Sequence, residues 1–403
     1  MKLKRVLHIA LIYNTYRDAV PEAPDDRGST NDLRRFIRSL ARALRSLGHR
    51  VTVLPLANDM LGFQRKLARL QPDVVFNQYD DVVHSALYEM RVAALVRMMG
   101  FPITGSHALA LGLCRYKHMA ASLLQGAGLP VPPDARLLER VKDVSGVKWR
   151  FPLIVQAAKE HAGVGLTRHS VVHSVTALRR QVGIILRDYH QPATVQRFLP
   201  GREFNIGIIG GAKQRVLPFA EVNYARLPPG IPPIMSYDAK WTESSIEYKC
   251  TSVICPADVA PPLARKLTNL TVKAFRALGG WGYGRVDIRL DEAGEPHVLE
   301  VNCNPCLEED VALARSAKAA GIAYPQLLQQ ILDAAFEKPP FDTDVPMLPP
   351  PRPQNPPRPP RHSPCRRYSA SIFWQMKNAF TPMMDARWPL TTRDRKRLIP
   401  TPC

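Results

Sequence analysis

The sequence predicts an α/β protein of several domains, followed by a separate C-terminal tail. Over about the first hundred residues, apolar segments of strand length alternate with segments of helical periodicity, which is typical of a parallel sheet covered by helices. Further along, two strand-like segments joined by a short turn carry charged residues at alternate positions. Beyond Lys338 the composition changes to proline and arginine. A chain of 403 residues can bury a sizeable core and has room for two or three domains.

The first part of the chain alternates strands and helices. Apolar runs at 6–13, 51–54 and 72–77 have the length of buried strands. Apolar residues recur at three- and four-residue spacing over 33–47, and Gly48 follows as a stop signal. A second helix is expected at 86–99, and a short strand that leads into a turn at 101–106.

The rest of the chain contains two further groups of elements, which a proline cluster at 130–133 separates from the first. Segment 236–243 has no secondary-structure period and is predicted to be a surface loop. Residues 338–403 are expected to be disordered or extended in polyproline II conformation. The remaining predicted strands are 152–157, 170–172, 193–199, 204–209, 214–218, 284–290 and 297–302, and the remaining helices are 117–125, 260–278 and 324–336.

The net charge of +20 is shared between the body and the tail. From Pro339 to Cys403 there are 11 Lys/Arg and 4 Asp/Glu, which leaves +7 in the tail and +13 in the body. A basic body suits anionic ligands such as nucleotides, and it attracts nucleic acid or acidic membrane without specificity. An unusual genomic composition explains the charge equally well. No apolar run reaches the roughly 18 residues that a membrane span needs.

The cysteines predict a reducing compartment. Seven of them, scattered along the chain, form no disulfide framework, so we expect a cytoplasmic protein. The basic start followed by 6–13 superficially resembles a signal peptide. Its apolar part is short, contains His8 and lacks a small-residue cleavage site, so a buried strand is predicted instead. Cys303 and Cys306 form a Cys-x-x-Cys pair without a second ligand pair nearby, which favours pocket lining over a redox or zinc site.

The strands at 284–290 and 297–302 carry the most specific chemical pattern. Side chains alternate on a strand, so Arg285 and Asp287 share one face, and Glu300 and Asn302 also share one. If the strands pair as a hairpin, these four side chains converge. Two carboxylates and an amide oxygen suit Mg²⁺, and a guanidinium binds an oxyanion. A surface hairpin with solvated charges is the alternative. The residues expected on the opposite, buried face are Val286, Ile288, Leu299 and Val301.

Weaker features point to the same nucleotide chemistry. Gly163 and Gly165 lie in a loop after a strand, where glycines let backbone N–H groups approach phosphates. Lys117 opens a helix and Lys240 lies in the loop-like segment, and either can reach a phosphate. Glu203 follows a Pro-Gly turn. Each of these residues, taken alone, is better explained by an ordinary surface position.

Eight stretches, taken together, resemble the D-alanine–D-alanine ligase branch of the ATP-grasp family. The most specific part is the Arg-x-Asp and Glu-x-Asn pair within 285–302. The resemblance covers roughly residues 1 to 336 and is weakest before residue 100. The stretches are 102–106, 117–118, 128–132, 151–155, 201–204, 237–240, 284–287 and 299–305.

The resemblance implies a three-domain ATP-grasp fold and a ligase activity. ATP phosphorylates a carboxylate, an amine attacks the acyl phosphate, and phosphate leaves. The expected cofactors are ATP and Mg²⁺ or Mn²⁺, and the expected substrates are an amino acid or small carboxylate and an amine. A homodimer is an option because the family is often dimeric, and no specific nucleic-acid partner is expected. The implied domains are an N-terminal parallel α/β domain at 1–112, a central lid at 113–194, a C-terminal α+β domain at 195–337 and the tail at 338–403.

Carried over to this chain, the family's functional residues form three groups. Asp287, Glu300 and Asn302 would hold the metal. Arg285 would stabilise the tetrahedral oxyanion, and Lys240 would meet the γ-phosphate from a mobile loop. Lys117 would bind the phosphates of the nucleotide, Phe198 and Leu199 would border the adenine, and Glu203 would bind the ribose. Gly163 and Gly165 would form the phosphate loop. Gln156 and Gln196 would also contact the nucleotide, at family positions that normally hold a lysine and an acidic residue.

The departures from the family pattern lie in the lid and in the amino-acid pocket. Gln156 stands where the family has a phosphate-binding lysine. Lys159 can take over that role only if the strand ends before it. Cys306 replaces a glycine on the substrate side. The glutamate that holds the first amino acid in the family has no clear match, and its nearest candidates are Asp26, Ser29, Asp32 and Glu89.

Two alternative functions stay open at this point. Gln156 and the lid loop at 161–165, which lacks the small hydroxyl residues that the family has there, are compatible with a non-catalytic ATP-binding protein on the same fold. The basic run of the tail at 393–397 is compatible with an interaction role, although no aromatic residue interleaves with it as stacking on nucleic acid would require.

Overall fold

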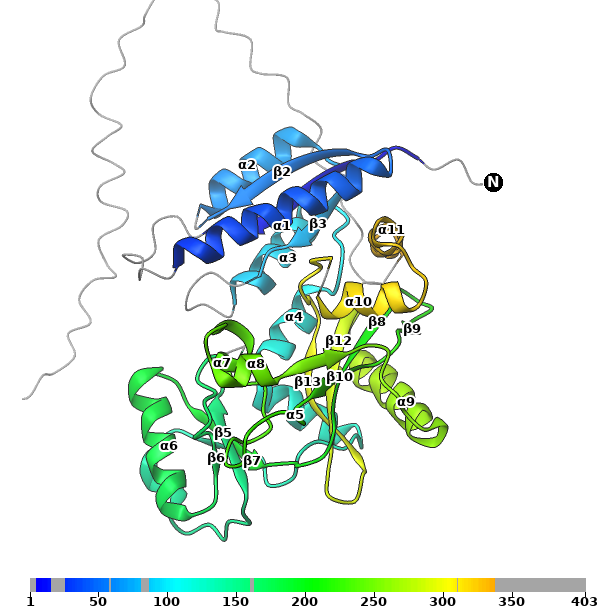
Figure 1. Ribbon diagram of the computed structural model, residues 1–403. Coiled ribbons are helices and arrows are strands. Elements are labelled where there is room, and N and C mark those ends of the chain that lie inside the picture. The colour runs from blue at the N-terminus through cyan, green and yellow to red at the C-terminus, as the bar shows by residue number, and fades with distance from the viewer. Residues whose placement is uncertain are drawn as a thin grey trace, which may run out of the picture. The chain divides into compact units, whose positions relative to one another are not determined.

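The computed structural model describes residues 5–15, 26–57, 59–80, 87–159, 163–309 and 311–337, without the side chains of 26–32. The predicted disorder of the tail at 338–403 therefore lies outside the described residues. Within those ranges the strands form three sheets (Figure 1). No helix in the described ranges is long and apolar enough to cross a membrane.

The N-terminal sheet is parallel, as the strand–helix alternation predicts. Its strand order is β2-β1-β3, with β1 at His8–Asn14, β2 at Arg50–Leu56 and β3 at Val74–Gln78. Side chains on β1 alternate between two cores. Ile9 and Leu11 pack with α1 (Asp26–Ser46), whereas Ala10 and Ile12 pack with α2 (Met60–Leu70) and α3 (Tyr88–Met98). The predicted buried strand at the start of the chain is confirmed, because β1 is almost wholly buried.

Two short helices, α4 (Ala108–Arg115) and α5 (Lys117–Gly126), follow this sheet. Tyr116 separates them with extended backbone, which sets the direction of the α5 N-terminus. The strand predicted at 101–106 is reduced to a single bridge between Val75 and Ile103.

The second sheet is antiparallel and carries one helix. Its order is β4-β7-β5-β6, with β4 at Arg136–Leu138, β5 at Leu153–Ala157, β6 at Val171–Val172 and β7 at Ala193–Arg197. Helix α6 (Val175–Asp188) packs Leu178, Val182 and Ile185 against the buried face of these strands. The Ser174 hydroxyl accepts a hydrogen bond from the Ala177 amide and so caps the helix.

The third sheet holds the hairpin that the sequence singles out. Its order is β11-β10-β8-β12-β13, and β9 pairs with β8. Helix α9 (Pro261–Ala277) shares a core with Val286 and Ile288, whereas α10 (Ala312–Ala319) and α11 (Tyr324–Ala334) belong to the core that contains Tyr283. The strands are β8 (Glu203–Gly210), β9 (Arg215–Val216), β10 (Ala220–Asn223), β11 (Ser252–Ile254), β12 (Gly282–Leu290) and β13 (Pro296–Asn302).

The loop prediction for 236–243 is wrong. Residues Tyr237–Trp241 form a short helix, α7, and Ile246–Cys250 form another, α8. The hydroxyl of Ser236 accepts from the Ala239 amide at 3.1 Å and caps α7. A helix of little more than one turn is too short to show a 3.6-residue period, so its apolar pattern cannot be read from the sequence.

Candidate active site

A cleft of about 560 Å³ lies among strands of the second and third sheets and the helices and loop that follow the first sheet. Its volume is in the range expected for a small-molecule site. The residues predicted for catalysis, metal and nucleotide line it, with the exception of Gly165. They are Lys117, Gln156, Gly163, Gln196, Phe198, Leu199, Glu203, Lys240, Arg285, Asp287, Glu300 and Asn302.

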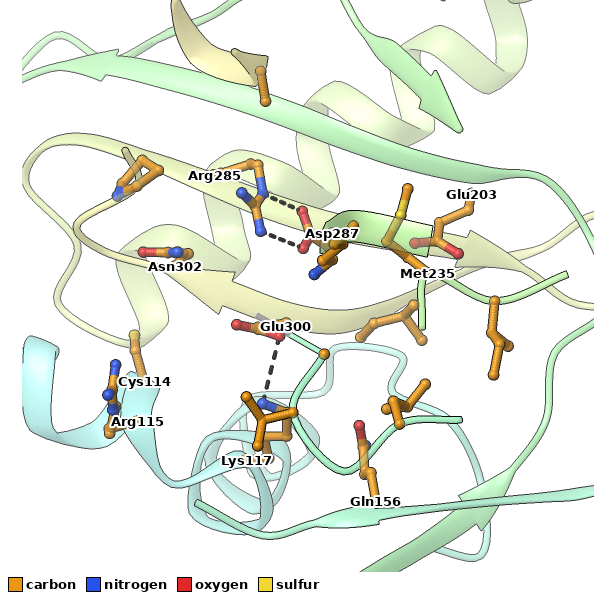
Figure 2. Close-up of a pocket in the computed structure, with 18 of the residues that line it drawn as sticks. Cys114, Arg115, Lys117, Gln156, Glu203, Met235, Arg285, Asp287, Glu300 and Asn302 are labelled. Atoms are coloured by element: carbon orange, nitrogen blue, oxygen red, sulfur yellow. Dashed lines mark hydrogen bonds and ion pairs between the residues drawn. The ribbon is translucent and has the colours of Figure 1, made fainter. Parts of the chain in front are cut away.

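The hairpin brings its four polar residues together, as predicted. In the antiparallel register Arg285 lies opposite Asn302, and Asp287 lies opposite Glu300. The Arg285 guanidinium binds Asp287 at both oxygens, Nε to Oδ1 at 2.7 Å and Nη2 to Oδ2 at 2.9 Å (Figure 2). Asn205 donates to the same carboxylate at 2.9 Å. Burial alone would lower the pKa of Arg285, but Asp287 raises it above the ordinary arginine value, so the guanidinium stays charged.

The predicted orientation of Leu299 is wrong. The register shifts between Asp287 and Ile288, so that Ile288 pairs with Val298 and Leu299 is the extra residue on β13. This β-bulge turns Leu299 toward the cleft, which it lines, and Val298 enters the core in its place. The bulge lies directly beside Glu300, at the strand segment that carries the proposed metal ligands.

The Glu300 carboxylate lies 3.6 Å from the Lys117 ammonium at the first residue of α5. Asn302 Oδ1 accepts from the Asn304 backbone amide at 2.9 Å, which fixes the amide orientation at the end of β13. No group of three or more His, Cys, Asp or Glu residues able to hold a metal occurs within the described residues. A set of two carboxylates and one amide is nevertheless compatible with Mg²⁺, which keeps several waters and binds substrate phosphates.

Lys240 reaches the cleft from α7, and α7 and α8 contact the loop between β5 and β6. The Tyr237 amide donates to the Leu166 carbonyl at 3.0 Å. Glu247 on α8 forms a 2.8 Å ion pair with Arg168. Burial and then the positive charge of Arg285 lower the pKa of Lys240 below that of an ordinary lysine, although nearby carboxylates partly oppose the shift.

The end of the cleft that contains Glu203 includes a residue that sequence reasoning missed. Arg289 forms an ion pair with Glu203 at 2.8 Å, and both side chains are almost completely buried. Tyr224 donates to the same Glu203 oxygen at 2.9 Å, and its pKa is raised well above the ordinary value, mainly by burial. The guanidinium of Arg289 also lies 5.0 Å from the ring centre of Phe198. A signal was available, because Arg289 shares the strand face of Arg285 and Asp287.

The two lid glycines have packing roles. Gly163 has a φ of +83°, and a Cβ there would lie 3.1 Å from the Tyr237 amide nitrogen. Gly165 has a φ of +76°; a Cβ there would meet Ile185 and Ala157, and it lines a different depression. Lys159 follows β5, which ends at Ala157, and it is exposed and not among the residues that line the cleft. Gln156 on β5, and not Lys159, therefore lines the cleft on the lid side.

The opposite end of the cleft combines residues from the segment after β3, from α3 and α4, and from the segment after β13. Cys114 and Cys303 have their sulfur atoms 3.2 Å apart, and the contact together with burial holds the pKa of Cys114 well above its usual value. Asp80 forms a 3.4 Å ion pair with Arg115. Glu89, one candidate for the family's substrate glutamate, is buried and lines the cleft. The side chains of the other candidates, Asp26, Ser29 and Asp32, lie outside the described residues.

Comparison with known proteins identifies the family. The family model "D-ala D-ala ligase C-terminus" matches residues 123–333, more than half of the chain. The chain belongs to the D-alanine–D-alanine ligase family. An uncharacterized protein, y4sG of Sinorhizobium fredii, is 30% identical over 75% of this chain and 88% of its own length. The D-alanine–D-alanine ligase of Rhodospirillum rubrum is 29% identical, with 73% of this chain and 89% of the relative covered.

Solved ligase structures share the fold. The D-alanine–D-alanine ligase of Bacillus anthracis, complexed with ATP, has a TM-score of 0.61 at 18% identity and covers 82% of this chain and 97% of that one. VanG D-Ala:D-Ser ligase of Enterococcus faecalis has a TM-score of 0.63 at 16% identity, with coverages of 82% and 100%. The predicted ATP-grasp fold is confirmed, as is the predicted class of the protein, an ATP- and Mg²⁺-dependent carboxylate–amine ligase that acts on small molecules.

Proposed function

We propose that this ligase joins an amino acid or another small carboxylate to an amine through an acyl phosphate, at the Arg285–Asn302 hairpin. The observation that carries the proposal is the direct pairing of Arg285 with Asn302 and of Asp287 with Glu300 on one wall of the cleft. Oxygen ligands and a charged guanidinium therefore lie side by side, where a phosphorylated carboxylate needs both.

Asp287, Glu300 and Asn302 would hold Mg²⁺. When bound, the metal neutralises negative charge on the transferred phosphoryl group. Asp287 is held in place by Arg285 and Asn205, so one ligand is oriented before the metal binds. Glu300 is accompanied by Lys117 at 3.6 Å, which places an ammonium beside the same oxygens.

Lys117 and Lys240 would bind the phosphates from two sides of the cleft. Burial lowers the pKa of Lys240 and so favours the neutral amine. A phosphate anion nearby would act in the opposite direction and favour the protonated form. Gln156 offers an amide donor at the position where the family has a lysine, so this chain holds the phosphates with one positive charge fewer there. Phe198 and Leu199 would border the adenine, with Gln196 beside them, and Glu203 would accept from the ribose.

Arg285 would stabilise the oxyanion when the amine attacks. The neutral amine forms the C–N bond to the acyl carbon, and the C–O bond to phosphate breaks. The proton released by the amine then passes to the departing phosphate, which balances the step. The guanidinium stays charged throughout, because Asp287 raises the pKa of Arg285.

The test is ADP formation from ATP and Mg²⁺ with a panel of amino acids, small carboxylates and amines, with mass spectrometry of the products. Glu300→Gln should abolish product formation. Glu295→Gln, on the turn of the same hairpin and exposed, is the matched control and should leave it unchanged. A folded protein that is stabilised thermally by ATP and yet forms no ADP with any pair would identify the chain as a non-catalytic nucleotide-binding protein.

We further propose that the protein is cytoplasmic and that it forms a homodimer. The five cysteines of the described residues are all free thiols, which fits a reducing compartment that contains ATP. Light scattering coupled to gel filtration measures the oligomeric state directly, and a fractionation experiment measures the location.

A further inference from the structure

Two thiols from distant parts of the chain are in contact in the wall of the cleft. The sulfur atoms of Cys114, on α4, and Cys303, directly after β13, lie 3.2 Å apart. Figure 2 shows Cys114 between Arg115 and Asn302. The two cysteines are 189 positions apart in the sequence, so the fold alone brings them together. Among the five cysteines that the structure describes, these are the two whose sulfurs touch.

The contact is close enough for a disulfide to form after a small movement. Cys114 and Cys303 belong to the same hydrophobic core, where α4 packs against β13. A disulfide requires a sulfur–sulfur distance of about 2.05 Å, so the two atoms have to approach by about 1 Å. Disulfides in proteins of reducing compartments are usually transient, and they serve catalysis or redox regulation.

The two cysteines lie beside residues that the proposed function uses. Cys303 directly follows Asn302, a proposed metal ligand. Cys114 precedes Lys117 by three residues, and the Lys117 ammonium lies 3.6 Å from the Glu300 carboxylate. A bond between the sulfurs therefore moves the end of β13 and the start of α5 relative to each other. A displacement of about 1 Å is enough to lower the rate of an enzyme about 10²-fold.

The surroundings of the pair select a small oxidant. Both side chains line the cleft, but Cys114 is only 5% exposed and Cys303 only 2%. Hydrogen peroxide is small enough to reach the sulfurs from the cleft, whereas a bulky disulfide such as oxidised glutathione is not. Because the pKa of Cys114 is raised, its thiol stays protonated at neutral pH and reacts slowly. The reduced pair is therefore the resting form, and only sustained exposure to peroxide converts it.

We propose that hydrogen peroxide converts Cys114 and Cys303 into a reversible disulfide and that this bond weakens the binding of ATP and Mg²⁺. One thiol sulfur attacks the O–O bond, which gives a sulfenic acid and one water. The second thiol sulfur then attacks the sulfenic sulfur, the S–S bond forms, and a second water leaves. The two thiols lose two electrons and two protons in total, and the peroxide is reduced to water. A dithiol reductant reverses the bond by exchange. The effect on ligation rests on the proposed function, whereas formation of the bond does not.

The experiment follows the bond and the nucleotide affinity in the same samples. The full-length protein is treated with hydrogen peroxide, free thiols are blocked with N-ethylmaleimide, and unreduced peptides are analysed by mass spectrometry. The peptide of Cys114 should be found linked to that of Cys303, with the loss of two hydrogen atoms. Isothermal titration calorimetry with ATP and Mg²⁺ should show an affinity about 10- to 100-fold lower, as expected when the support of a metal ligand is disturbed. Dithiothreitol should restore it.

Variants of the cysteines identify the pair that reacts. Cys114→Ala and, independently, Cys303→Ala should each abolish the link and make ATP binding insensitive to peroxide. Cys255→Ala is the matched control, because Cys255 is partly buried and does not line the cleft, and it should keep both responses. Cys306 lies close to Cys303 in sequence, so Cys306→Ser is included, and the link should persist in it.

Three results would overturn the proposal. They are a link between Cys303 and Cys306 in place of Cys114, a Cys114–Cys303 link that leaves the affinity for ATP unchanged, and a loss of affinity that persists in both alanine variants. Failure of the ligase is recognised separately. If the reduced protein forms no ADP with any substrate pair, the proposed function falls, while the link and its effect on ATP binding are still measured.

Discussion

The hairpin in the middle of the cleft and the end of the cleft that contains Asp80 and Glu308 are built in different ways. The middle is one hairpin in which Asp287 and Glu300 lie opposite each other, so a few neighbouring residues determine the geometry. That end takes Asp80 from the segment after β3, Arg115 from α4 and Glu308 from the segment after β13. The proposed metal ligands are thus held on one hairpin, whereas the other end of the cleft is assembled from segments that can change independently.

The largest expected effect concerns the buried ion pair at the Glu203 end. Arg289→Met should lower the free energy of unfolding by about 3–5 kcal/mol, because it leaves the buried Glu203 carboxylate without its cation. Urea unfolding measures the loss. Arg202→Met is the matched control, since its pair with Glu221 is partly exposed and should contribute about 0–1 kcal/mol. Recovery of stability in the double variant Arg289→Met/Glu203→Gln would identify the unpaired carboxylate as the cause of the loss, and an unrecovered loss would contradict it.

The next effect tests the middle of the cleft. Asp287→Asn should lower kcat roughly 10²- to 10³-fold, since it removes a proposed metal ligand and the bidentate partner of Arg285. Steady-state kinetics over a range of Mg²⁺ concentrations provides the measurement, with circular dichroism as the check on folding. A fall of less than about tenfold at saturating Mg²⁺ would remove Asp287 from the metal site.

A smaller gain is expected on the lid side. Gln156→Lys should tighten ATP binding by about three- to tenfold, because it adds a positive charge to the wall of the cleft that faces the phosphates. Gln156→Met, of similar length and neutral, is the control and should not tighten it. Isothermal titration calorimetry with ATP and Mg²⁺ measures both. Unchanged affinity in Gln156→Lys would show that this position does not meet the phosphates.

The smallest effect concerns the end of the cleft that contains Cys306 and Glu308. The Cys306 side chain lines the cleft and is exposed to solvent, but the surrounding protein still desolvates its thiol. Because this desolvation raises the pKa of Cys306 to about 11, its alkylation by iodoacetamide should be slow at neutral pH and rise with a midpoint near that value. Mass spectrometry of the labelled peptide across a pH series gives the midpoint. Glu308→Gln should lower it modestly, since desolvation is the larger cause and the Glu308 charge a smaller one. A midpoint that does not move would mean that Glu308 lies away from Cys306.

Much of the fold and the centre of the site could be predicted because their determinants are local. Strand and helix periods predict β1, β2, β3 and the parallel sheet that they form. The short helix α7 and the bridge at Ile103 could not be predicted, because each is shorter than the period that would identify it. The domain boundaries at 112, 194 and 337 stay predictions, as do the roles of the individual site residues.

By itself, the sequence determined which side chains form the hairpin site, because alternation on a strand makes Arg285 and Asp287 share a face whatever surrounds them. Tertiary structure decided what lies around them. The bulge that turns Leu299 into the cleft depends on how two strands pair. The pairing of Arg289 with Glu203, and the meeting of Asp80, Cys306 and Glu308, join residues far apart in the chain. Such contacts are set by the packing of sheets and helices against one another, so no local pattern encodes them.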